Sequence, residues 1–229
     1  MKRNFLKQGF TLAEILIALT IIGVIAAVTM PVLIGNSQDK ELAAGLKKNY
    51  SVFKQVLTHY YADTGEMLTQ STENTAADSK RIKEALIKYV SNIKDCGYGW
   101  ESYDAANNTQ SCIPFGKFGS IYKTYNGNNL GGSAGAFDQG QFVLSDGTAV
   151  FLNADSPHGT LISVDVNGFE KKPNRLGKDL FVFQLTQDGD LLPGGAAGTW
   201  YSDENTYCSN TSTNTKNGAG CAAKVLQEQ

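Results

Sequence analysis

Residues 10–34 read FTLAEILIALTIIGVIAAVTMPVLI, and Glu14 is the only ionisable side chain in this stretch. Positions 15–34 therefore supply the roughly 20 uncharged residues that a helix needs to cross the hydrocarbon core of a membrane. The nine residues before this stretch, MKRNFLKQG, carry three positive charges and no negative one. Basic residues on this side favour a cytoplasmic N-terminus, so the rest of the chain is expected on the far side of the membrane.

Glu14 helps to decide among three interpretations of this apolar stretch: a cleaved signal peptide, an uncut signal anchor and a segment that is retained after a cut at Gly9. A secretory signal peptide would be cut behind the apolar residues, near Ala26-Ala27, and an uncut signal anchor would leave Glu14 unexplained. A carboxylate inside an apolar helix costs about 2.5–3.5 kcal/mol on insertion scales, so it is rarely found there without a partner. A cut between Gly9 and Phe10 would create a positive amine near Glu14, on this chain or a neighbouring one, and this amine is a natural counter-ion.

The string KQGFTLAE at residues 7–14 resembles the class III signal of type IV pilins and type II secretion pseudopilins. The resemblance implies that a prepilin peptidase removes residues 1–9 by cutting after Gly9 and that it methylates the new N-terminal Phe10. The resemblance is specific over residues 1–60, and beyond them it concerns only the expected arrangement of helix and sheet.

The same resemblance gives assembly roles to Glu14, Gly23 and Pro31. Family members commonly place a flexible glycine and a helix-kinking proline at the last two positions. Proline lacks a backbone donor and clashes with the carbonyl four residues earlier, so the helix is expected to kink or open locally at Pro31. A helix that simply ends at the membrane surface is the alternative.

A second stretch of helical periodicity follows Pro31 and indicates one continuous helix from about residue 10 to residue 63. Thr64-Gly65 is expected to end it. Its buried face is predicted from apolar residues at three- and four-residue spacing: Leu42, Leu46, Tyr50 or Phe53, Leu57, and Tyr60 or Tyr61.

The remaining chain predicts a small antiparallel sheet. A helix is expected at residues 79–94, capped by Asp78 or Ser79, and then an irregular, surface-exposed stretch at residues 95–139. Strands are expected at residues 141–145, 148–152, 161–166 and 179–186, with turns at Asp146-Gly147 and at residues 188–190. A long helix on such a sheet is an α+β arrangement and agrees with the pilin resemblance. The expected organisation is a leader (1–9), a transmembrane and filament-core helix (10–34) and an exported head (35–229).

The four cysteines predict disulfides, because an exported head folds in an oxidising compartment. Three connectivities are possible. Cys96–Cys112 and Cys208–Cys221 are favoured, since each pair closes a short polar loop that has no regular structure to hold it. Zinc is the alternative, but the chain has no C-x-x-C pair and neither histidine is near a cysteine in sequence.

A cluster of oxygen-bearing side chains makes Asp165, Asn167 and Asp179 candidate calcium ligands, because calcium takes six to eight oxygens. The pattern departs from an EF-hand loop, since the glycine comes too early and no Glu stands at the twelfth position. The simpler interpretation is an Asn-Gly turn with solvated carboxylates.

The remaining features favour a structural subunit over an enzyme. The net charge of −2 does not indicate nucleic-acid binding, and the chain has no G-x-S-x-G, Walker or dinucleotide motif. The resemblance implies self-assembly with other pilins, a prepilin peptidase and an inner-membrane assembly platform as partners. It places the subunit in the bacterial inner membrane before assembly and in a periplasmic or cell-surface filament afterwards. The alternatives are a type II secretion pseudopilin and a minor tip pilin with an adhesive or DNA- or substrate-binding head.

Overall fold

The computed structural model of the chain describes residues 10–69, 76–90, 93–98, 112–113, 117–131, 137, 139–154 and 159–228. The chain divides into two compact units, Met1–Glu41 and Leu42–Gln229. The described part of the first unit is almost entirely helical, whereas the second unit contains the sheet and both hydrophobic cores.

Helix α1 runs without interruption from Leu12 to Thr64, so it belongs to both units. Gly65 ends it in a left-handed conformation with a φ of 73°, and the Gly65 N–H donates to the Tyr61 carbonyl at 2.8 Å. A glycine reaches this conformation without a Cβ clash, so the predicted stop at Thr64-Gly65 is confirmed.

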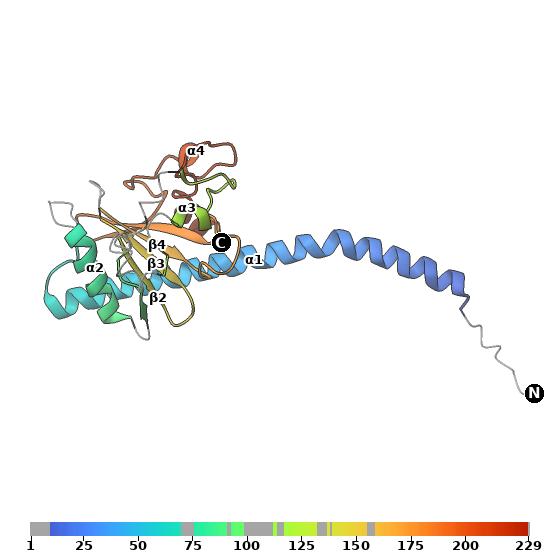
Figure 1. Cartoon of the computed structure of the whole chain (residues 1–229), viewed down its shortest axis with the longest axis horizontal. Coiled ribbons are helices and arrows are strands. Elements are labelled where there is room, and N and C mark those ends of the chain that lie inside the picture. The colour runs from blue at the N-terminus through green and yellow to red at the C-terminus, as the bar shows by residue number, and fades with distance from the viewer. Residues whose placement is uncertain are drawn as a thin grey trace, which may run out of the picture. The chain divides into compact units, whose positions relative to one another are not determined.

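The second unit contains a six-stranded antiparallel sheet in which every strand pairs with the next one along the chain (Figure 1). The strands are β1 (Lys94–Asp95), β2 (Gly140–Val143), β3 (Ala149–Asn153), β4 (Thr160–Asp165), β5 (Leu180–Leu185) and β6 (Leu191–Pro193). The four predicted strands correspond to β2–β5, and the expected α+β class is confirmed.

One face of the sheet packs against α1 and α2 (Ala76–Tyr89). The helices contribute Leu46, Phe53, Val56, Ile82 and Leu86 to this core, and the strands contribute Phe142, Val150, Leu152, Ile162, Val164, Phe181, Phe183 and Leu185. The alternate positions in β3 and β5 point to the opposite face, as the period of two in a strand requires.

That opposite face has its own core, which corrects the expectation of an exposed stretch at residues 95–139. The short helix α3 (Phe118–Ile121) lies in this stretch, and Phe118, Tyr122 and Phe137 are buried. They pack against the face of the sheet that carries Phe151. Because β3–β5 are apolar on both faces, both faces must be covered, and the Gly- and Asn-rich stretch supplies the aromatic side chains that do it.

Three further differences concern short elements. The helix expected at residues 79–94 spans Ala76–Tyr89, and Lys94–Asp95 belongs to β1. The C-terminal region forms α4 (Glu204–Tyr207) and α5 (Cys221–Gln227), neither of which was predicted.

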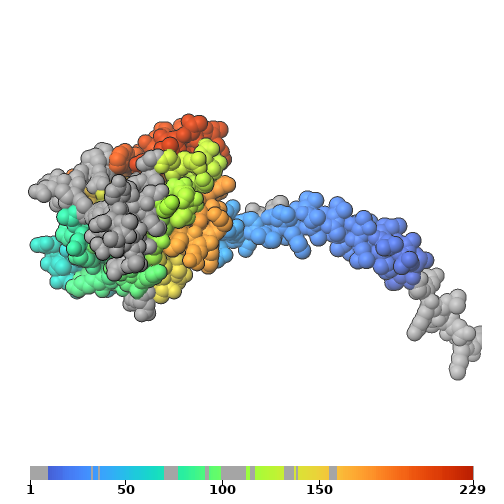
Figure 2. Space-filling model, viewed as in Figure 1, coloured from blue at the N-terminus to red at the C-terminus, as the bar shows by residue number. Residues whose placement is uncertain are grey.

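In Figure 2 the described C-terminal residues, in red, lie at the surface beside the yellow-green segment around residues 117–131. The Tyr125 N–H donates to the Asn217 carbonyl at 2.8 Å and joins the two segments.

Candidate functional site

The N-terminal half of α1 presents an uncovered apolar surface in the single subunit. The exposed large apolar side chains are Phe10, Leu12, Ile15, Leu16, Ile17, Leu19, Ile21, Ile22, Val24, Ile25, Val28, Met30, Leu33 and Ile34. By length and composition α1 can cross a membrane. A surface this apolar needs lipid or other protein chains to cover it.

Two threonines in the apolar stretch already have hydrogen-bond partners inside the helix. The Thr20 hydroxyl donates to the Leu16 carbonyl at 2.8 Å, and the Thr29 hydroxyl donates to the Ile25 carbonyl at 2.9 Å. Both bonds reach back four residues, so these hydroxyls bring no unsatisfied donor into an apolar surrounding.

Glu14 also has partners, which sequence reasoning missed. The Thr11 N–H and the Thr11 hydroxyl both donate to Glu14 Oε2 at 2.8 Å, and the Glu14 N–H donates back to Thr11 Oγ1 at 3.3 Å. Thr11 precedes the first helical residue, so the pair forms a capping box with Thr11 at the N-cap and Glu14 at the N3 position. The T-x-x-E spacing was the signal that could have found it. Glu14 thus has hydrogen-bond donors within its own chain, although no ion pair to it occurs among the residues that the structure describes.

The other residues predicted for processing and assembly are placed as follows. Gly9 lies outside the described residues, and Phe10 is 84% exposed. A Cβ added at Gly23 would meet no atom within 4 Å, so packing inside this chain does not require a glycine there. Helix α1 continues through Pro31, so the alternative of a helix that ends there is excluded, whereas a kink or local opening at Pro31 stays a prediction. Loss of one backbone hydrogen bond does not interrupt a helix of 53 residues.

The structure contains the first of the two favoured disulfides, Cys96–Cys112. Cys96 follows β1, and its N–H donates to the Gln141 carbonyl in β2 at 3.1 Å. The buried Gln141 side chain then binds both backbone groups of Ile113, at 2.9 and 2.8 Å. The bridge and this amide together fix residues 112–113 to the sheet.

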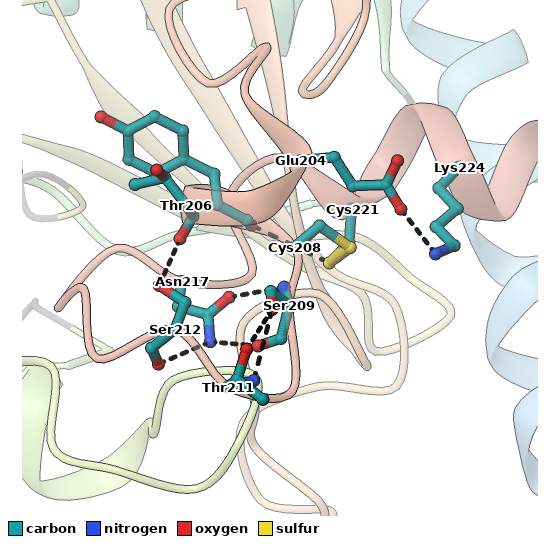
Figure 3. The surroundings of a disulfide bond; sticks show 10 residues. Glu204, Thr206, Cys208, Ser209, Thr211, Ser212, Asn217, Cys221 and Lys224 are labelled. Atoms are coloured by element: carbon teal, nitrogen blue, oxygen red, sulfur yellow. Dashed lines mark hydrogen bonds and ion pairs between the residues drawn. A yellow bond between two sulfur atoms is a disulfide. The ribbon is translucent and has the colours of Figure 1, made fainter.

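The second favoured disulfide, Cys208–Cys221, closes a loop that is organised around a buried asparagine (Figure 3). The Asn217 amide donates to the Ser209 and Ser212 carbonyls at 2.7 and 3.3 Å and accepts from the Ser209 N–H at 3.0 Å. Asn217 therefore replaces the backbone ladder that this Ser- and Thr-rich loop lacks. An ion pair between Lys224 and Glu204, at 2.7 Å, links α5 to α4 outside the loop.

The candidate calcium ligands form a hydrogen-bonded cluster. Asp165 and Asp179 are buried, and each accepts hydrogen bonds on both of its carboxylate oxygens. The donors are the Tyr122 hydroxyl and backbone N–H groups. Asn167 and Asn174 each have one buried side-chain oxygen without a partner among the described residues.

This donor set does not fit calcium, which takes six to eight oxygen ligands. Both carboxylates already accept hydrogen bonds from N–H and O–H groups on each oxygen, which a calcium ion would have to compete with or displace. Among the residues that the structure describes, no group of three or more His, Cys, Asp or Glu side chains is placed to hold a metal ion. Calcium binding at Asp165, Asn167 and Asp179 stays a prediction without support from the geometry.

Burial governs the electrostatics of this cluster. Desolvation raises the pKa of Asp165 to about 7, although hydrogen bonds from Tyr122 and from backbone N–H groups oppose the rise. Burial also raises the pKa of Asp179. The nearby negative charge of Asp179 adds to the rise at Asp165, because two buried carboxylates repel each other at low dielectric.

Comparison with known families finds one matching family model, described as the prokaryotic N-terminal methylation motif, over residues 5–30. The match covers the KQGFTLAE string and most of the exposed apolar surface of α1. No solved structure matches the chain.

Two curated relatives are similar to part of the chain. A fimbrial protein of Neisseria meningitidis serogroup B (strain ATCC BAA-335 / MC58) is 33% identical over 90 residues, which cover 38% of this chain and 51% of the relative. The type IV major pilin protein PilE of Neisseria gonorrhoeae is 33% identical over 90 residues, with 38% and 52% covered. The chain thus spans about half the length of the curated relatives it matches. Their names describe pilus proteins, in agreement with the expectation of a structural subunit rather than an enzyme.

Proposed function

We propose that this chain, which combines a prepilin-type N-terminal motif with a pilin-like α+β architecture, is a structural subunit of a type IV pilus or pilus-like filament. One observation carries the proposal: the matched methylation motif leads into a helical surface at residues 15–34 that is uncharged and whose large apolar side chains are exposed. The similarity to proteins named fimbrial protein and type IV major pilin supports it.

Before assembly, the apolar half of α1 anchors the subunit in the inner membrane. The basic leader stays in the cytoplasm and the head lies in the periplasm, in accordance with the positive-inside rule. A prepilin peptidase removes residues 1–9 and methylates Phe10. The methylated amine keeps its positive charge and lies in the turn that precedes Glu14.

During assembly, Glu14 exchanges its capping partner for a charge on another subunit. In the isolated chain Thr11 supplies the hydrogen bonds to Glu14. In the filament, the amine of Phe10 on a neighbouring subunit supplies the positive charge, which is worth more at low dielectric than in water. Other subunits replace lipid around residues 15–34, and the Glu14 contact sets the axial register.

Mass spectrometry of the mature N-terminus tests this proposal directly. We expect a chain that begins at Phe10 and carries one added methyl group. The same measurement on a Gly9→Ser variant controls for processing at another site. A mature chain that starts at Met1, or one cut beyond Ala27, would contradict the proposal.

A second experiment addresses the kind of filament. Sheared surface fibres from cells that express the chain should contain it as an abundant component if it is a major pilin. Enrichment in periplasmic fibres, together with a defect in protein export when the chain is deleted, would instead identify a secretion pseudopilin. A trace amount in surface fibres would identify a minor or tip subunit.

A further inference from the structure

One end of the sheet carries a basic groove in the second unit. The groove has a volume of about 280 Å³ and is lined in part by Lys94, Phe169, Glu170 and Lys171. Its three charged residues are exposed. We call these four residues the basic groove.

The turn between β5 and β6 has the opposite charge. Asp188 and Asp190 are exposed on either side of Gly189. These three residues and Lys54 of α1 border one shallow hollow in the surface. Met67 is 60% exposed and lies directly against the turn, since a Cβ added at Gly189 would be 2.9 Å from the Met67 Cβ. We call these five residues the acidic tip.

The groove and the tip lie at opposite ends of the strands. In the β4–β5 pair, Asp165 is opposite Leu180 and Thr160 is opposite Leu185. The groove lies beside the end that holds Asp165, whereas the tip follows Leu185 at the other end. Six residues of strand separate the two by about 20 Å. The tip therefore cannot enter the groove of its own chain, and a contact between them requires two copies.

We propose that the acidic tip of one copy docks into the basic groove of the next copy and forms a head-to-tail contact in the filament. Charge complementarity carries the inference: the two aspartates of the tip match Lys94 and Lys171, and Lys54 matches Glu170. Met67 would meet the ring of Phe169, a favourable thioether–aromatic contact. A contact between two different surfaces can repeat from copy to copy, and it gives an open filament when the rotation between copies does not close into a ring. The inference rests on the proposed function for the presence of neighbouring copies.

Charge reversal in the full chain tests the contact. Asp188→Lys with Asp190→Lys, or Lys94→Glu with Lys171→Glu, should each lower the yield of sheared fibre about tenfold, because like charges then face each other. The four substitutions together should restore the yield. Lys80→Glu, on the exposed side of α2, controls for charge alone and should leave the yield unchanged. Unchanged yield in both reversed variants, or no rescue in the combined variant, would overturn the contact.

Cysteine cross-linking separates the contact from the filament proposal. Asp188→Cys combined with Lys171→Cys should give a ladder of cross-linked copies in sheared fibres, and either substitution alone should give no ladder. Fibres without a ladder overturn the contact and leave the proposed function standing. A ladder in membranes of cells that make no fibres supports the contact and contradicts the proposed function. The absence of both fibres and ladder overturns both.

Discussion

Thr11 and Glu14 show how a single pair of residues settles the start of a long helix. The capping box satisfies the Thr11 and Glu14 backbone N–H groups, two of the donors near a helix start that otherwise lack partners. It also gives the Glu14 carboxylate hydrogen-bond donors before any other subunit is present. The cost of carrying a carboxylate next to an apolar stretch is therefore smaller in the free subunit than the sequence alone suggests.

Replacement of the cap should loosen the first turn of α1. Thr11→Val removes the hydroxyl that donates to the Glu14 carboxylate and accepts from the Glu14 N–H. We therefore expect a loss of about 1 kcal/mol in the local stability of the helix start. Amide hydrogen exchange over residues 12–15 of the detergent-solubilised chain measures it. Thr11→Ser keeps the hydroxyl and should exchange like the parent; equal protection in the Val variant would contradict the role of the cap.

Asp165 should make the stability of the head depend on pH. Its pKa is about 7 in the folded chain against 3.8 ordinarily, so the folded state binds more protons between these values. Stability from this group is complete below pH 4 and is lost as the pH rises through 7, by up to about 4 kcal/mol. Denaturant unfolding from pH 4 to 8 measures the effect.

The Asp165→Asn variant tests whether this carboxyl, together with its coupling to Asp179, causes the pH dependence. The amide keeps an oxygen for the backbone donors but cannot ionise, so the variant should gain stability relative to the parent as the pH rises from 5 to 8. A difference between the two proteins that stays constant with pH would show that Asp165 does not titrate in this range.

Among the elements, those with a strong local pattern were predictable from sequence. The Asp146-Gly147 turn and the strands beside it follow from a turn dipeptide between apolar runs. Helix α1 follows from its periodicity and from the glycine that ends it. β1 and β6 have only two and three residues, and such short edge strands exist because of their pairing partners rather than their own sequence.

The site shows the same division between local and non-local information. The T-x-x-E spacing of Thr11 and Glu14 is local and could have been found in the sequence. The role of Asn217 was not visible, because it depends on carbonyls five and eight residues away in a loop that a disulfide closes. The second core was not visible either, since Phe118 and Phe137 belong to no periodic segment and are buried by the far face of the sheet.

The C-terminal disulfide should stabilise the head by closing a loop with a sequence separation of 13 residues. The combined change Cys208→Ala and Cys221→Ala should lower the free energy of unfolding by about 3 kcal/mol in the chain-entropy description. Thermal unfolding followed by near-ultraviolet circular dichroism measures this. Ser209→Ala with Ser212→Ala is the matched control, because it keeps the backbone groups that bond to Asn217. An equal loss of unfolding free energy in this control would show that the polar side chains of the loop, and not the disulfide, account for the stabilisation.

At the scale of the whole molecule, the first unit is apolar outside and the second is apolar inside. The second unit buries most of its described large hydrophobic side chains in two cores on the faces of one sheet. The N-terminal half of α1 has no such protection. Lipid and the apolar helices of other chains are two surroundings that could cover this surface.

Replacement of the carboxylate should separate these two outcomes. Glu14→Val removes the only ionisable side chain in residues 10–34 and should leave membrane insertion intact, since the stretch becomes more apolar. We expect at least a tenfold lower yield of sheared fibre, because a counter-ion contact at low dielectric is lost. Membrane fractionation and fibre shearing measure the two effects. Glu14→Asp keeps the charge and should retain part of the assembly; normal fibres from the Val variant would exclude a role in register.

The internal hydrogen bonds of Thr20 and Thr29 have a thermodynamic consequence. A segment whose hydroxyls are already satisfied has little electrostatic preference between two apolar solvents, one made of lipid tails and one made of neighbouring helices. For these two hydroxyls, the transfer free energy between one apolar surrounding and another is therefore small.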